Sequence, residues 1–240
     1  MPKIAYLTID DGPSKDMKQK VDFLAKKKVP AIWFCRGDFL SLRPSYGVYA
    51  IKRGFILGNH AYSHRQFSRL PLKECFEEIG KTDLIIEKLY KKAGTRRPAK
   101  FFRFPYGDKG CPEGDTSKES ELKRRRLQDF LKKCGYIRPR FNGITYRYYK
   151  ARSAKEVDWY WTYDVLEYSI FRKAHTFGID SLDKVFERME ENNPERFGGL
   201  NYKKSEDIIL LHDHPESTRI FQPIINRLLS KNIEFRFPSF

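Results

Sequence analysis

The sequence has few cysteines and no long apolar run. Its four cysteines, at positions 35, 75, 111 and 134, include no Cys-x-x-Cys pair, which excludes a zinc ribbon and a dense disulfide framework. Cys35 and Cys75 stand in apolar sequence, so we expect small core residues in a reducing compartment. No stretch approaches the roughly 18 consecutive apolar residues that a transmembrane helix needs, and the first residues are typical of a strand, not of a signal peptide. The chain as written is expected to be cytoplasmic, or extracytoplasmic if a leader has been removed.

Positive charge is what the chain has in excess. Among 240 residues, 47 are Lys or Arg and 31 are Asp or Glu, a formal net charge of +16. With 40% hydrophobic and 15% aromatic residues, the chain is not a disordered polyelectrolyte and should form a full core. The charge predicts attraction to an anionic partner, such as an acidic glycan or a wall surface. Nucleic acid is a less favoured partner, because most lysines are scattered over several predicted helices.

Short β-type runs alternate with helical patterns along the chain. The predicted strands are Lys3–Ile9, Ala31–Phe34, Phe55–Leu57, Phe101–Phe104, Val157–Trp161, Ile208–Leu211 and Ile233–Phe237. The predicted helices are Lys15–Lys27, capped by Ser14, and Leu72–Lys92, Ser120–Lys133, Ser181–Glu191 and Ser217–Ser230. The alternation predicts an α/β fold, a distorted (β/α) barrel with about seven parallel strands. Residues 1–240 are expected to form a single domain with an insertion at about 108–156.

Unusual polar residues follow several of the predicted strands. They are Asp10 and Asp11, His60 and His64, Arg103 and Pro105, Asp164 and Glu167, and His212. In a barrel such positions meet at the C-terminal rim, where active sites of these folds are built. The other two histidines, His175 and His214, lie outside these clusters and are assigned to solvated loops.

The segment GNHAYSH places His60 and His64 four residues apart. This spacing predicts two imidazoles on one side of a helical turn, within reach of one metal ion. A zinc protease would have Glu directly after the first histidine, and Ala61 stands there instead. Taken alone, the Asp10–Asp11 pair also fits a solvated turn, and exposed histidines need no function. The joint arrangement is what favours a site.

Four motifs in order resemble the polysaccharide deacetylases with a NodB-type domain, carbohydrate esterase family 4. TIDDGP is similar to the first motif of that family, GNHAYSH to the second, RFPYG at 103–107 to the third, and LLH at 210–212 to the fifth. The resemblance extends over most of the chain. It implies a distorted (β/α) barrel with fewer than eight strands, in agreement with the strand count.

The resemblance also implies a metal centre and its catalytic groups. Asp11, His60 and His64 would hold a divalent ion, usually zinc in this family, with Co²⁺ or another divalent ion as an alternative. Asp10 would be the general base that deprotonates the attacking water, and Arg103 would orient Asp10.

His212 would protonate the departing amine, supported by Glu167 in the fourth motif. The substrate would contact Pro105, the backbone N–H of Tyr106, the apolar wall at Leu210, and Asp164 and Tyr168. The fourth motif of the family usually has Asp and Trp where this chain has Glu167 and Tyr168, which leaves Asp164 as the reserve partner of His212.

The second motif also departs from the family pattern. Ala61 replaces the usual Ser or Thr, so one hydrogen bond to the histidine loop is either missing or supplied by Ser63. The loss of such a supporting bond typically costs about 10- to 100-fold in metal affinity or activity.

Three functions are therefore considered. The first is metal-dependent hydrolysis of N-acetyl or O-acetyl groups on a polysaccharide or oligosaccharide, with release of acetate. The second is a catalytically impaired glycan-binding protein, suggested by Ala61 and the altered segment DVLEY. The third is hydrolysis of a small amide that is not a sugar.

Overall fold

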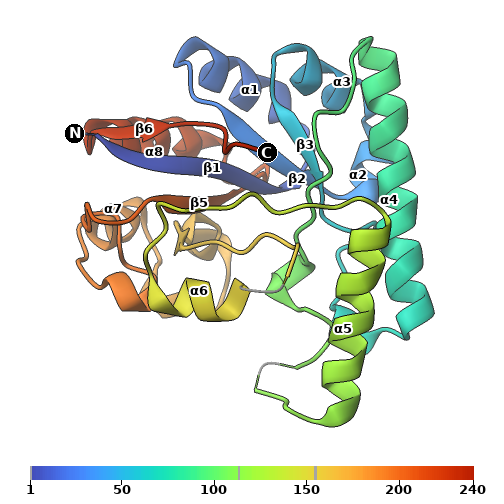
Figure 1. The fold of residues 1–240 in the computed structure, drawn as a ribbon. Coiled ribbons are helices and arrows are strands. Elements are labelled where there is room, and N and C mark those ends of the chain that lie inside the picture. Colours follow the sequence, from blue (N-terminus) through green and yellow to red (C-terminus); the bar gives the residue numbers. More distant parts are fainter. Residues whose placement is uncertain (1, 113, 154–155) are drawn as a thin grey trace.

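The computed structural model of the chain describes residues 2–112, 114–153 and 156–240. Helices surround a central sheet (Figure 1). The strands are β1 (Lys3–Gly12), β2 (Ala31–Cys35), β3 (Ile56–Asn59), β4 (Tyr163–Asp164), β5 (Asp207–His212) and β6 (Ile233–Phe235). The α-helices are α1 (Met17–Lys26), α2 (Gly37–Leu42), α3 (Pro44–Lys52), α4 (Leu72–Ala93), α5 (Lys118–Lys133), α6 (Arg147–Ser153), α7 (Leu182–Met189) and α8 (Thr218–Ser230). The 3-10 turns are η1 (Phe67–Arg69), η2 (Pro105–Gly107), η3 (Glu167–Phe171), η4 (Thr176–Gly178) and η5 (Pro194–Arg196).

Strand β1 lies at the centre of the sheet. The order is β3-β2-β1-β5-β4, and β6 pairs with the first residues of β1. Every ladder between the described strands is parallel, which confirms the predicted α/β class. Parallel strands end at one edge, so the C-terminal ends of β1, β3 and β5 lie close together.

Both faces of the sheet are covered, as expected for apolar strands in a parallel sheet. On one face Trp33 belongs to a buried cluster with residues of α1 and α8. On the other face Phe34 packs with Phe101 and Trp159. Cys35 and Cys75 are fully buried and unpaired, which confirms their assignment to the core.

Two of the predicted strands do not form. The segments 101–104 and 157–161 run through the gap between β3 and β4 without forming ladders. Asn59 and Phe102 form an isolated bridge, and the Trp159 N–H donates to the Phe102 carbonyl at 2.8 Å. Strand pairing cannot extend beyond Phe104, because Pro105 has no N–H to donate and starts the turn η2. Six strands, not about seven, are present in the described parts of the chain, and no ladder closes the barrel.

The five predicted helices all form, with small differences in their bounds. Helix α1 begins at Met17 rather than Lys15, and Ser14 does not cap it: its hydroxyl donates to Asp213 at 2.8 Å and accepts from the N–H of Asp16, the residue before the helix, at 3.1 Å. The sequence pattern does not predict α2, α3 and α6, since helices of six to nine residues repeat too little to be recognised. No helix in the described parts of the chain is long and apolar enough to cross a membrane.

The predicted insertion at 108–156 includes α5 and α6. Residues 113, 154 and 155 of this segment lie outside the described residues. Helix α5 runs beside α4 (Figure 1), where Phe76 and Phe130 stack with ring centroids 4.2 Å apart. Leu127 and Leu131 of α5 are fully buried in the same cluster as Phe102. The helix is therefore packed into the core rather than attached to the surface.

Candidate active site

Asp10 and Asp11 lie near the end of β1 and are almost buried, with 3% and 7% of their surface exposed. The pairing of β1 with β2 shifts between Asp10 and Gly12, and Asp11 has a φ of 66°. Neighbouring side chains of a regular strand point to opposite faces, so this irregularity lets both carboxylates approach one imidazole. His60 Nε2 lies 3.5 Å from Asp10 Oδ2 and 3.7 Å from Asp11 Oδ1.

His60 and His64 follow β3 in a loop, and the predicted helical turn is wrong. Ala61 and His64 have left-handed φ values of 61° and 59°. The Ala61 N–H donates to the side chain of Asn59 at 2.8 Å, which fastens the loop to the end of β3. The two imidazole centroids lie 5.0 Å apart, and His64 Nε2 lies 3.0 Å from Asp11 Oδ1.

The surroundings of His60 keep its imidazole neutral and set its tautomer. Its Nδ1 lies 2.8 Å from the carbonyl oxygen of Arg103. A carbonyl only accepts, so Nδ1 carries the proton and the lone pair of Nε2 faces the two carboxylates. Burial lowers the pKa of His60 to about 4, although the charge of Asp10 opposes this shift. A neutral imidazole whose free nitrogen faces a carboxylate is the form that binds metal.

Asp11, His60 and His64 each offer one ligand atom, and these atoms lie within 4.8 Å of one another. Asp11 Oδ1 is buried and accepts no well-aligned hydrogen bond. Burial by itself would raise the pKa of Asp11, but a hydrogen bond from His214 and the close approach of His64 hold it well below its usual value. One ionised carboxylate oxygen and two imidazole nitrogens suit a divalent ion such as zinc and leave positions for other ligands.

Arg103 fixes the other carboxylate. Its Nη1 donates to Asp10 Oδ1 at 2.7 Å and to Thr8 Oγ1 at 2.9 Å. The guanidinium is fully buried and lies over the ring of Phe34, 4.4 Å from its centroid. Because Arg103 occupies Oδ1, the second oxygen of Asp10 remains on the side of His60.

His212 ends β5 and is paired with Glu167. Its Nδ1 lies 3.3 Å from Glu167 Oε1, and its backbone N–H donates to the same oxygen at 2.6 Å. Burial alone would lower the pKa of His212, but the hydrogen bond and charge of Glu167, together with Asp164, raise it to about 10. Desolvation raises the pKa of Asp164 to about 6. His212 is therefore protonated at neutral pH.

Asp164, Glu167 and His212 also offer ligand atoms that lie within 4.8 Å of one another, as a metal site requires. A metal ion binds only an unprotonated imidazole nitrogen, and His212 is protonated, so this group is better described as an ion pair. The ring of Tyr168 packs edge-on against His212 with centroids 4.6 Å apart. Glu167, despite its longer side chain, thus reaches His212, and Asp164 lies beside the pair.

The sequence pattern places His214 in a solvated loop, and the structure corrects this. Its Nε2 lies 2.9 Å from Asp11 Oδ2, and only 16% of its side chain is exposed. One signal in the sequence could have revealed it, since residues two apart in an extended segment share a face, and His212 lies two positions before. His175 is exposed, as predicted.

Ser63 supplies hydrogen bonds that fasten the histidine loop, one of the two alternatives that Ala61 leaves open. Its hydroxyl donates to Glu78 Oε1 at 2.7 Å, and its N–H donates to Oε2 of the same carboxylate at 2.7 Å. Ser63 therefore ties the histidine loop to α4 rather than bonding a histidine.

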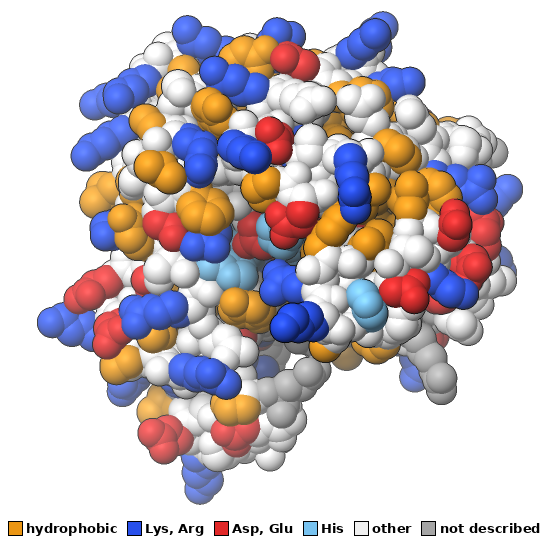
Figure 2. All heavy atoms as spheres, turned by 180° about the vertical axis from the view of Figure 1, so that it is seen from behind, with side chains coloured by type: hydrophobic (Ala, Val, Ile, Leu, Met, Phe, Trp, Pro, Cys, Tyr) orange, Lys and Arg blue, Asp and Glu red, His pale blue; other side chains and the backbone are white. Residues whose placement is uncertain are grey.

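A cavity of about 680 Å³ opens over the site. Its walls include Asp10, Asp11, Arg36, His60, His64, Tyr106, Trp161, Asp164, Tyr168, Arg172, Lys173, Leu210, His212 and His214. Pro105 is buried at the start of η2 and is not among the wall residues. The sequence pattern does not predict that Arg36, Trp161, Arg172 and Lys173 line the site, because they lie in loops and at element ends. Figure 2 shows this face, with histidine and acidic side chains in the middle and Lys and Arg side chains beside them.

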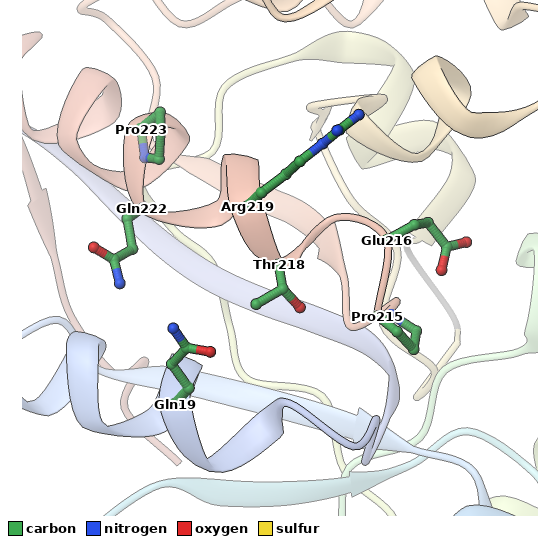
Figure 3. Close-up of a pocket in the computed structure, with 7 residues that line it drawn as sticks. All are labelled: Gln19, Pro215, Glu216, Thr218, Arg219, Gln222 and Pro223. Atoms are coloured by element: carbon green, nitrogen blue, oxygen red, sulfur yellow. The ribbon is translucent and has the colours of Figure 1, made fainter.

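Two further hollows lie elsewhere on the surface. One, of about 1080 Å³, shares Tyr106 with the first cavity and includes Tyr148, Tyr160 and Phe197 in its walls. The other lies between α1 and α8 (Figure 3), where the side chains of Gln19 and Gln222 point toward one another. None of the predicted site residues lines this last hollow.

The chain is similar to known deacetylases in sequence. The sequence model of a family described as Polysaccharide deacetylase matches residues 1–124, just over half of the chain. The peptidoglycan-N-acetylmuramic acid deacetylase PdaC of Bacillus subtilis is 36% identical over 99 residues, which cover 40% of this chain and 21% of that protein. The peptidoglycan-N-acetylglucosamine deacetylase of Bacillus cereus is 33% identical over 126 residues, which cover 52% of this chain and 41% of that protein. The matched part is therefore less than half the length of either relative.

The fold agrees with this similarity. A family 4 carbohydrate esterase from Streptomyces lividans, solved in complex with acetate, superposes with a TM-score of 0.60 over 99% of this chain and 93% of that chain, at 20% sequence identity. At 20% identity this superposition supports the fold alone, whereas the match of the family model to residues 1–124 supports common ancestry. On these grounds the chain belongs to the polysaccharide deacetylase family.

Proposed function

We propose that this protein is a metal-dependent hydrolase that removes N-acetyl groups from a glycan and releases acetate. One observation carries the proposal: the ligand atoms of Asp11, His60 and His64 converge within 4.8 Å beside the free oxygen of Asp10. Residues 1–240 would act as one domain, with α5 packed into its core. The deacetylases named above support the choice of substrate class.

The metal ligands would be Asp11 Oδ1 and the Nε2 atoms of His60 and His64. A divalent ion held there supplies electrophilic activation of the water and of the acetamide carbonyl. His60 would bind the ion as a neutral imidazole, because its pKa is lowered to about 4. Asp11 would bind it as an ionised carboxylate, because its pKa is held well below the usual value.

The proton transfers would fall to Asp10 and His212. Asp10 Oδ2 takes a proton from the attacking water, while Arg103 holds Oδ1 and keeps the carboxylate in one orientation. The amine leaves only if it gains a proton, and His212, which is paired with Asp10 across β1 and β5 and also lines the cavity, supplies it. Glu167 keeps His212 protonated, since it raises the pKa of the imidazole to about 10.

The glycan chain would extend from the first cavity into the larger hollow. The two meet at Tyr106, a residue that is 62% exposed. Trp161 lines the first cavity and Tyr160 the second, and their rings stack with centroids 4.2 Å apart and planes at 16°. Aromatic faces are suited to the apolar faces of sugar rings. Arg172 and Lys173 are exposed at the rim and favour an acidic glycan.

The first experiment is acetate release from N-acetylated chitooligosaccharides and from peptidoglycan after the protein has been loaded with zinc. Asp10→Asn should abolish turnover while one zinc ion stays bound, and His175→Ala, which changes a side chain that does not line the cavity, should behave as wild type. Saccharide binding without acetate release by the wild type would instead favour a glycan-binding protein. Hydrolysis of small acetylated amides alone would point to the third function.

A further inference from the structure

His214 touches the oxygen of Asp11 that the proposed metal ion would not use. Its Nε2 lies 2.9 Å from Asp11 Oδ2, whereas His64 Nε2 lies 3.0 Å from Oδ1. The two imidazoles thus approach the two oxygens of one carboxylate. A carboxylate held by a donor on one oxygen presents the other oxygen in a fixed direction, as supporting bonds do at metal sites.

The hydrogen bond also defines the tautomer of His214. An ionised carboxylate only accepts, so Nε2 of His214 carries the proton. Its Nδ1 is buried and has no hydrogen-bond partner among the described residues. No second partner therefore competes with Asp11 for the orientation of this ring.

The backbone under His214 is held by a buried ion pair. Lys20 Nζ lies 2.7 Å from Asp213 Oδ1, and the two side chains are 1% and 0% exposed. The same ammonium donates to the carbonyl of His214 at 3.0 Å. Helix α1 thereby holds the loop after β5 through one side chain that bonds two successive residues.

The loop is also tied to the end of β1. The Asp213 N–H donates to the carbonyl of Asp10 at 2.8 Å. Asp213 Oδ2 accepts from the N–H of Ser14 at 2.7 Å, and Oδ1 accepts from its hydroxyl at 2.8 Å. The segments on both sides of Asp11 and His214 are therefore fastened to each other, which fixes the distance between the two side chains.

From this geometry we infer that His214 is a positioning residue that turns Asp11 Oδ1 toward His60 and His64, with Lys20 and Asp213 holding His214 in place. The inference rests on the proposed metal site. It predicts that the hydrogen bond from His214, and not its bulk, sets the affinity of the site for a divalent ion.

The test measures metal binding in the absence of substrate. The dissociation constant for zinc is determined by competition with a chromophoric chelator for wild type, His214→Ala, His214→Gln and the control His175→Ala. The loss of one supporting bond at a metal site should weaken binding about 10- to 100-fold in His214→Ala. His214→Gln places an amide donor near the position of Nε2 and should recover most of the affinity.

A spectroscopic measurement separates positioning from a general loss of structure. The visible absorption of bound Co²⁺ reports ligand geometry, so the His214→Ala spectrum should differ from wild type while His214→Gln and His175→Ala resemble it. Thermal unfolding of each metal-free variant verifies that the fold is kept. If His214→Ala does not fold, the comparison of His214→Gln with wild type in both measurements decides the question.

Several results would overturn the inference. An unchanged zinc dissociation constant and Co²⁺ spectrum in His214→Ala would show that Asp11 needs no support from His214. A loss of affinity that His214→Gln shares in full would show that the donated hydrogen bond is not the cause. If wild type binds no zinc or Co²⁺, the proposed function itself fails, and this outcome is distinct from the other two.

Discussion

Arg103 Nη1 donates to Asp10 Oδ1 at 2.7 Å, and the two side chains are 0% and 4% exposed. Arg103 comes from the segment before η2 and Asp10 from the end of β1, so the pair joins two distant segments of the chain at the candidate site. Its guanidinium lies against Phe34, and its carbonyl accepts the hydrogen bond that sets the tautomer of His60. One residue therefore orients the base and, through its backbone, a metal ligand.

Arg103→Met should destabilise the protein by about 3–5 kcal/mol, because it leaves the buried carboxylate of Asp10 without its partner. The exposed pair of Arg236 and Glu234, 52% and 42% exposed, offers a matched control. Arg236→Met should leave the stability nearly unchanged, because solvent screens an exposed pair. Urea unfolding measures both free energies, and similar losses in the two variants would contradict the assignment of a buried, stabilising partner to Asp10.

The pH dependence of stability and of acetate release should be set by the ion pair of His212 and Glu167. The pKa of His212 is raised from 6.5 to about 10, so its ion pair stabilises the fold fully below pH 6.5 and loses this contribution as the pH rises through 10. Glu167→Gln removes the charge that raises the pKa. The alkaline loss of stability and the alkaline fall in acetate release should then both move to lower pH.

NMR titration of the His212 ring in wild type and Glu167→Gln measures this shift directly. His175→Ala should leave the His212 titration unchanged, because His175 bonds the carbonyl of Ser169 and not the His212 pair. A His212 pKa that is the same with Glu167 or Gln at position 167 would show that the ion pair does not control the proton.

Lys20→Met should destabilise the protein, because Asp213 is then left as a buried charge without its cation. The expected loss is about 3–5 kcal/mol. Lys184 pairs with Glu187 on the surface, with side chains 50% and 64% exposed, so Lys184→Met should cost little stability. Chemical unfolding of both variants gives the comparison, and equal costs would mean that the buried pair does not fasten the loop that carries His214.

Gly58→Ala and Gly80→Ala should have opposite effects on stability. A Cβ at Gly58 in β3 would lie 2.5 Å from Cδ1 of the buried Phe34 ring, so we expect a loss of about 1–3 kcal/mol from overpacking. A Cβ at Gly80, inside α4, meets no atom within 4 Å, and alanine there should add up to about 1 kcal/mol. Thermal unfolding of the two variants settles the signs, and a stabilised Gly58→Ala would show that β3 does not need the close approach of Phe34.

The sequence by itself determined the parallel α/β class and the place of the candidate site. Alternation of apolar runs with amphipathic helices requires a sheet covered on both faces, as seen around Trp33 and Phe34. Because parallel strands end at one edge, Asp10, His60 and His212 could be expected together from their positions at strand ends.

Only the tertiary structure decided the contacts that depend on loop geometry. The left-handed residues Ala61 and His64 replace the predicted helical turn, and nothing in a spacing of four distinguishes the two. The segments 101–104 and 157–161 have strand-like composition, yet the first makes only two backbone hydrogen bonds to Asn59 and one to Trp159. Ladder length depends on neighbours from elsewhere in the chain.

His214 and Lys20 illustrate the same limit most clearly. They are separated by 194 positions, and the sequence pattern assigns His214 to a solvated loop and indicates no partner for Lys20. Their burial follows from the way α1 and the loop after β5 meet above β1, where a charge needs a partner of opposite sign. Such pairs are chosen by the packing of distant segments, so they become visible only when the chain has folded.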